Sequence, residues 1–185
     1  MKTLIPALLT LLLALPAAAG TLAGVTLPDK VDVDGKSLVL NGMGLRKKFV
    51  IKVYVGGLYL PQKESSPAKV LGADVPSRMV LHFIYDVSKD QMCEAWNEGL
   101  EANTPNASAE VKKNFNTLCS WMDGVGEGQR LVLTYKPGDG TQVEVGGKVK
   151  GVLSGKPTTD AILSTWIGKE PGPGEDFKKA VLGGK

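Results

Sequence analysis

The chain has 185 residues, and its 22 lysines and arginines against 19 acidic residues leave a formal net charge of +3. Because this small excess is spread along the chain, it does not form the clustered basic face that a phosphate backbone requires. We therefore expect no nucleic-acid partner.

The first nineteen residues predict a secretory signal peptide. Met1 and Lys2 are a short basic start, residues 4–15 are mainly apolar, and residues 16–19 read Pro-Ala-Ala-Ala, which is typical of a cleavage site. No later segment reaches the roughly 18 consecutive apolar residues of a membrane span. We expect an exported protein, periplasmic or secreted, with no membrane span after cleavage; the alternative is a retained N-terminal anchor. Residues 20–185 have the length of a single domain.

Six segments rich in valine, isoleucine, leucine and tyrosine predict β-strands. They are residues 36–40, 49–60, 78–87, 130–136, 141–145 and 148–153. Glycine pairs at 138 and 140 and at 146 and 147 separate the last three segments, and glycine favours hairpin turns because it accepts positive φ without steric cost. An antiparallel meander is therefore expected there.

Three segments predict helices. Ser88 is a candidate N-cap with Gln91 at the capping-box position, so a helix is expected over residues 88–102. Two more are expected over residues 107–122 and 159–167, stopped by Gly124 and Gly168. This order of strands, a helix pair, strands and a last helix indicates the α+β class, because βαβ alternation is missing. Composition indicates disorder only in a Pro/Gly-rich stretch at 169–174.

The two cysteines, Cys93 and Cys119, fall on the two middle helices. A short turn at 103–106 should make these helices antiparallel, with both cysteines at comparable distances from it. An oxidising compartment permits a disulfide between them, whereas two buried free thiols are equally compatible with the sequence. With one histidine and no Cys-x-x-Cys pair, no metal site is predicted.

A glycine-rich segment opens the clearest motif of the chain. Residues 41–46 read Asn-Gly-Met-Gly-Leu-Arg, and residues 52–60 read Lys-Val-Tyr-Val-Gly-Gly-Leu-Tyr-Leu. The two glycines lack the third glycine of a dinucleotide loop and no βαβ unit follows them, so we expect no cofactor. Near the C-terminus, residues 161–168 read Ala-Ile-Leu-Ser-Thr-Trp-Ile-Gly.

These two motifs, in this order, resemble the chalcone isomerase family over residues from about 25 to 183. In that family a glycine-rich strand carries an arginine into a ligand cleft, and a late helix carries a Thr-x-Ile-Gly signature that faces the same cleft. The residues that match the first motif are Gly42, Gly44, Arg46, Lys52, Gly57, Tyr59 and Leu60. The resemblance implies an antiparallel β-sheet covered on one face by helices, the open-faced β-sandwich of chalcone isomerase-like proteins.

Arg46 is the strongest candidate for ligand binding. Its guanidinium stays charged at any working pH, and its planar fork matches a carboxylate or an aryl oxyanion. In chalcone isomerases the matching arginine holds the oxyanion of the substrate. The alternative interpretation is a surface arginine beside Lys47 and Lys48.

The catalytic set of the family is incomplete, so no catalytic residue is assigned. The plant enzymes have a threonine where this chain has Tyr54, and the non-catalytic, fatty-acid-binding branch has a tyrosine there, paired with the arginine on a carboxylate. Aligning the asparagine of the catalytic helix on Asn97 places Asp90 where the enzymes have a tyrosine. Thr165 matches the threonine of the last helix. The resemblance therefore implies a ligand site made of Arg46, Tyr54, Asn97 and Thr165.

One geometric condition applies to this site. In an uninterrupted strand the Cα atoms of Arg46 and Tyr54 would be roughly 26 Å apart. Both side chains can hold one carboxylate only if a bulge or turn occurs between Lys47 and Val50.

We expect a secreted, cofactor-free protein that binds a fatty acid or a similar small amphipathic anion in a cleft, without catalysis. The first alternative is a cofactor-independent isomerase, an intramolecular lyase acting on a phenolic enone. The second is a structural or protein-interaction module whose cleft is filled by side chains.

Overall fold

The structure is a computed structural model that describes residues 19–184. The expected signal peptide lies outside these residues, apart from Ala19.

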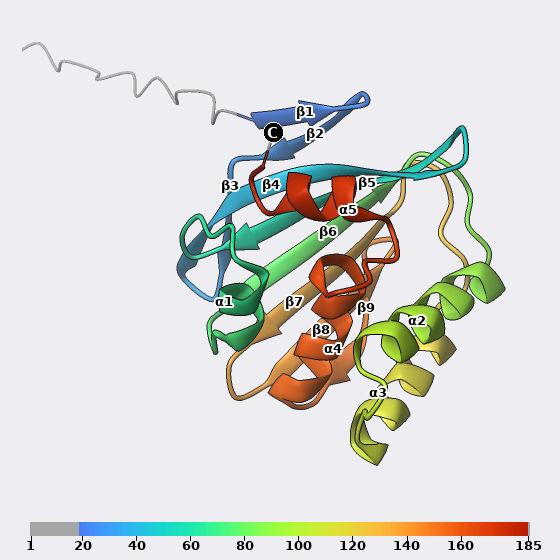
Figure 1. Cartoon of the computed structure of the whole chain (residues 1–185). Helices are drawn as coiled ribbons and strands as arrows, with labels where there is room; N and C mark the ends of the chain where they lie inside the picture. Colours follow the sequence, from blue (N-terminus) through green and yellow to red (C-terminus); the bar gives the residue numbers. More distant parts are fainter. Residues whose placement is uncertain (1–18, 185) are drawn as a thin grey trace, which may run out of the picture.

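Seven strands form one antiparallel sheet in which each strand pairs with its neighbours in the sequence (Figure 1). They are β3 (Lys30–Val33), β4 (Lys36–Lys48), β5 (Ile51–Leu60), β6 (Ser77–Phe83), β7 (Arg130–Lys136), β8 (Gly140–Val145) and β9 (Lys148–Leu153). A separate hairpin is formed by β1 (Ala19–Leu22) and β2 (Val25–Pro28).

The helices lie on one face of this sheet (Figure 1). They are α1 (Pro67–Gly72), α2 (Lys89–Asn103), α3 (Ala109–Ser120), α4 (Lys156–Ile167) and α5 (Glu175–Val181). The predicted α+β fold, an antiparallel sheet covered on one face by helices, is confirmed. Among the residues that the structure describes, no helix is long and apolar enough to cross a membrane.

Two hydrophobic cores lie on opposite faces of the sheet. The larger core packs alternate residues of β5 to β9, such as Leu81 and Phe83, against the helices. The smaller core packs Val55 and Tyr59 of β5 against Leu27 of β2. The N-terminal hairpin therefore partly covers the face that the helices leave open.

The β4–β5 hairpin differs from the prediction of separate strands at residues 36–40 and 49–60. β4 continues through the glycines to Lys48, and Phe49 and Val50 form a two-residue loop before β5. Phe49 has φ of 56°, a conformation that glycine or asparagine adopts more readily. Without either residue at the loop, the sequence carries no turn signal there.

The sequence pattern also failed to predict several short elements, and it predicted one strand to extend further than it does. The pattern predicted none of β1, β2, β3, α1 or α5, each of which has seven residues or fewer. β6 ends at Phe83 and not at residue 87, because the chain then turns away and Val87 makes an isolated bridge with Val125. Short segments contain too few repeats of a period to be recognised.

The Pro/Gly-rich stretch at 169–174 is an ordered loop, which corrects the expectation of disorder. Asn103, the last residue of α2, donates its Nδ2 hydrogen to Glu170 O at 2.8 Å and accepts from Glu170 N at 2.9 Å. Gly172 N donates to Thr165 O at 2.9 Å. These bonds attach the loop to α2 and α4.

The glycines of the first motif provide room for α5. A Cβ atom on Gly42 would lie 2.0 Å from Ala180 O, and one on Gly44 would lie 2.8 Å from Cδ2 of Phe177. Gly56 on β5 likewise faces Phe177, with a Cβ distance of 2.5 Å to Cζ. The glycines therefore allow close packing of a helix on the sheet, and not the approach of a ligand.

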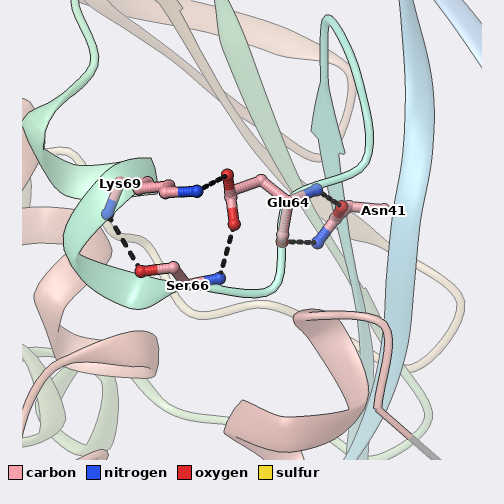
Figure 2. A network of polar contacts seen from close by, with 4 residues as sticks. All are labelled: Asn41, Glu64, Ser66 and Lys69. Carbon is pink, nitrogen blue, oxygen red and sulfur yellow. Dashed lines mark hydrogen bonds and ion pairs between the residues drawn. The ribbon is translucent and has the colours of Figure 1, made fainter.

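Asn41 ties α5 and the β5–α1 connection to the same place on β4, and Figure 2 shows the part of this network that links Asn41 to Glu64 and Ser66. Its side chain is buried and donates to Val181 O at 2.9 Å and to Glu64 O at 3.0 Å. Glu64 N donates back to Asn41 Oδ1 at 2.8 Å, and the Glu64 carboxylate accepts from Ser66 N at 2.8 Å. A buried amide with all these partners holds three chain segments together.

Candidate functional site

A cavity of about 470 Å³ lies between the sheet, α2, α4 and the loop at 169–174. Its wall is largely apolar and includes Leu81 and Phe83 of β6, Met92 and Trp96 of α2, and Trp166 of α4. The charged residues that line it are Arg46, Lys48, Asp86, Glu94, Glu98 and Glu170, and the four carboxylates among them are solvent-exposed. An apolar wall with few convergent polar groups is typical of a small-molecule site.

Arg46 and Tyr54 lie opposite each other at this cavity. They are direct register partners on β4 and β5, and both belong to its wall. Directly opposite residues of an antiparallel pair have Cβ atoms about 5 Å apart and point to the same face. The turn that the shared site required is present at Phe49 and Val50.

A β-bulge produces this pairing. Counting back from the two-residue loop, Lys48 pairs with Ile51 and Lys47 with Lys52, so regular pairing would place Arg46 opposite Val53. The register shifts at this point, and Arg46 pairs with Tyr54 instead. Bulges next to binding sites commonly redirect a side chain in this way.

The Tyr54 hydroxyl is neutral and can still donate its hydrogen in a hydrogen bond. Burial raises the pKa of Tyr54 to about 12, although the Trp166 hydrogen bond and the charge of Arg46 act in the opposite direction. Trp166 Nε1 donates to the hydroxyl oxygen at 3.0 Å. Because the oxygen already accepts this bond, the hydroxyl hydrogen can be donated to a ligand.

Arg46 is held at the cavity by the C-terminal loop. Its Nη1 donates to Gly172 O, and Gly172 also lines the cavity. A guanidinium has five N–H donors, so further donors are available to an anion. The ordering of residues 169–174 is thus part of how Arg46 is positioned.

Thr165 and Asn97 occupy different positions. Thr165 is buried on α4 and lines the cavity, but its hydroxyl donates to Ile162 O at 2.8 Å. Asn97 is exposed and does not line the cavity, because the buried face of α2 is formed by Met92, Trp96 and Gly99. The structure therefore brings Arg46, Tyr54 and Thr165 together and leaves Asn97 outside.

Trp96 is a cavity residue that sequence reasoning missed. Its indole Nε1 is buried and has no hydrogen-bond partner among residues 19–184. Its ring packs edge-on against Trp166, with ring centroids 5.2 Å apart. The helical spacing of Met92, Trp96 and Gly99, at i, i+4 and i+7, would have indicated this inward face.

Cys93 and Cys119 are paired in a disulfide that joins α2 to α3, with Cα atoms 5.1 Å apart. This separation lies within the range of protein disulfides. The link fixes the outer side of α2 to α3, while the opposite side of α2 forms the cavity wall. In the described part of the chain, no group of three or more His, Cys, Asp or Glu residues is placed to hold a metal ion.

The chain matches the chalcone isomerase-like family model over residues 19–183 and therefore belongs to this family. Its fold is similar to the crystal structure of a fatty-acid binding protein of Arabidopsis thaliana, with a TM-score of 0.71 and 17% sequence identity. The match covers 90% of this chain and 96% of that one, and at this identity it shows the fold alone. No curated protein matches the chain significantly in sequence.

Proposed function

We propose that this protein binds a small amphipathic carboxylate, of which a fatty acid is the best fit, and does no chemistry on it. The observation that carries the proposal is the pairing of Arg46 with Tyr54 at the wall of an apolar cavity. A charged guanidinium and a neutral phenol can both donate to one carboxylate, and the apolar wall suits a hydrocarbon chain.

A carboxylate is a better acceptor for Arg46 than the group it now contacts. A carboxylate carries the charge opposite to that of the guanidinium and can accept two parallel N–H bonds from it, which a single peptide oxygen cannot. The peptide oxygen of Gly172 is neutral, so an entering carboxylate can share or replace that contact. The four exposed carboxylates at the rim disfavour an anion that does not reach Arg46.

Non-catalytic binding is favoured because the enzyme-type residues are not assembled. Asn97 and Asp90 are exposed outside the cavity wall, and the Thr165 hydroxyl is already hydrogen-bonded within its helix. That the structurally similar Arabidopsis protein is a fatty-acid binding protein also supports binding over catalysis. The open volume of the cavity disfavours the alternative of a filled cleft.

The sequence of the first nineteen residues is the basis for proposing export to the periplasm or the exterior. Mass spectrometry of the N-terminus of the protein recovered from the exported fraction tests this proposal. A protein that retains Met1 inside the cell would contradict it.

The ligand proposal is tested by fatty-acid titration of the wild type and of Arg46 variants. Arg46→Ala should weaken binding by about 1.5–3 kcal/mol, roughly tenfold or more, because a charge-assisted hydrogen bond is lost. Arg46→Lys should recover only part of the affinity, since the ammonium keeps the charge but not the planar fork. The methyl ester of the same fatty acid should bind the wild type weakly.

Arg130→Ala is the matched control, because Arg130 is an exposed arginine outside the cavity that donates to His82. It removes the same charge and should leave the affinity unchanged. If Arg46→Ala lowers the melting temperature strongly while the fatty-acid affinity stays at the wild-type value, Arg46 is a residue of the fold and the proposed site is wrong.

A further inference from the structure

The loop of the β4–β5 hairpin exposes large apolar side chains. Phe49 is 92% exposed, Val50 93% and Ile51 41%. Figure 1 shows this hairpin extending beyond the neighbouring strands. We call residues 47–52 the hairpin tip.

A further exposed apolar residue, Tyr85, lies beside the tip. Tyr85 is 49% exposed, and the preceding residue, Ile84, donates its backbone N–H to Val53 O at 2.9 Å. The other exposed large hydrophobic residues of the described chain, Val75, Val149 and Val152, lie on other elements or connections. The apolar exposure is thus concentrated where the β4–β5 hairpin meets the end of β6.

Three lysines surround these apolar side chains. Lys47 and Lys52 are direct cross-strand partners, and Lys48 is adjacent to the loop. Directly opposed like charges destabilise a strand pair. None of the three forms an ion pair within residues 19–184. An external negative charge would therefore relieve a repulsion that the folded chain carries.

The loop conformation adds to this argument. Phe49 has φ of 56°, which is unfavourable for a bulky residue and favourable for glycine or asparagine. A polar or small residue would suit both the solvent exposure and the backbone. Neither packing within the folded chain nor the backbone conformation accounts for a phenylalanine here, and its ring is free to contact an external surface.

We propose that the hairpin tip docks on an anionic lipid bilayer surface, with Phe49 and Val50 inserted at the headgroup level and the three lysines on the lipid phosphates. Apolar side chains together with lysines are the combination that binds such interfaces, where insertion reaches roughly 5–10 Å. This proposal does not depend on the ligand proposed above.

Docking would also place the cavity at the membrane surface. Lys48, Phe49, Ile51 and Tyr85 belong to the cavity wall as well as to the exposed region. Arg46 lies three residues from Phe49, roughly 10 Å along the strand. The cavity entrance would then face the depth at which lipid carboxylates and phosphates are found.

Vesicle flotation tests the proposal with the protein purified as it is exported, compared on phosphatidylcholine vesicles with and without phosphatidylglycerol. The wild type should float with the anionic vesicles only, and added salt should release it. Phe49→Ser with Val50→Ser should lower the affinity at least tenfold. Replacing each tip lysine by glutamine should cost about fivefold, the equivalent of about 1 kcal/mol per lysine near an anionic surface.

Two controls make the result specific to the tip. Val149→Ser with Val152→Ser removes apolar side chains that are 58% and 50% exposed on β9, and it should not change vesicle binding. All variants share the same N-terminus, so any contribution of the first residues cancels. Val50→Ser alone, Lys47→Gln and Lys52→Gln change residues outside the cavity wall, so these single variants should weaken vesicle binding but keep fatty-acid affinity, which separates docking from ligand binding.

A position-specific signal completes the test. Phe49→Trp should add fluorescence that brominated lipids quench on binding to anionic vesicles. The proposal is overturned if the tip variants float as the wild type does, if phosphatidylcholine alone binds equally well, or if the tip binds a protein partner and no vesicles.

Discussion

Gly42→Ala tests whether the glycines of β4 serve the packing of α5. The added Cβ would lie 2.0 Å from Ala180 O and 2.9 Å from Gly183 N. Both neighbours are backbone atoms, so no side-chain rotation relieves the contact. Either β4 or α5 has to move.

The expected cost follows from what α5 buries. Overpacking a core position costs about 1–3 kcal/mol when the surroundings adjust. If α5 detaches, the buried side chains of Phe177, Val181 and Leu182 are exposed, at about 2 kcal/mol each. We therefore expect Gly42→Ala to lower the free energy of unfolding by about 3 kcal/mol or more, with a ceiling of about 6 kcal/mol.

Urea unfolding measures this change as a shift of the midpoint at constant slope. Gly72→Ala is the matched control, because its Cβ would meet nothing within 4 Å and Gly72 ends a helix. Alanine there should be neutral or slightly stabilising. Equal stability of the two variants would refute the packing role of Gly42.

Two further predictions concern the disulfide and Tyr54. The Cys93–Cys119 bridge joins residues separated by 26 positions in the sequence, and its reduction should lower the free energy of unfolding by about 3 kcal/mol. If alkylation of the unfolded, unreduced protein detects two free thiols, the bridge is absent and this prediction is wrong. The pKa of Tyr54 is about 12 in the folded state against 10.0 ordinarily, so its contribution to stability is complete below pH 10 and is lost between pH 10 and 12. This loss is at most about 2.7 kcal/mol, and urea unfolding across this range should show a shallower decline for Tyr54→Phe than for the wild type. Equal declines in the two proteins would mean that Tyr54 does not titrate in this range.

The elements predicted well have local signals. The capping box of Ser88 and Gln91 specified the start of α2, and both of its hydrogen bonds are present. Glycine turns defined β7, β8 and β9 to within one residue of the predicted bounds. Such signals involve only residues near in sequence, so they can be read without knowledge of the fold.

The arrangement of the site depends on contacts between residues that are far apart in the sequence, so it could not be predicted from local patterns. α5 is only seven residues long and is held by packing on β4 and by Asn41, 140 residues before its partner Val181. The cavity wall contains Gly172, which Arg46 reaches across 126 residues of sequence. Asn97 was selected by alignment to a family motif, whereas helical periodicity alone would have selected Trp96. A motif match does not specify which face of a helix turns inward.

The relation between Arg46 and Tyr54 could not be read from the sequence, because it results from two compensating bulges. Next to the loop, Lys48 pairs with Ile51 and Lys47 with Lys52. From Arg46 to Gly42 the pairing is shifted by one residue relative to this register. At Leu40, which pairs with Tyr59, the first register returns. Val53 is the extra residue of the first bulge and Asn41 that of the second. Side chains alternate between the faces of a sheet, so without the shift Tyr54 would lie opposite Leu45 and face away from the helices. The buried hydrogen bonds of Asn41 stabilise the second bulge, and they therefore help to hold the tyrosine beside the arginine, which lies five residues further along β4.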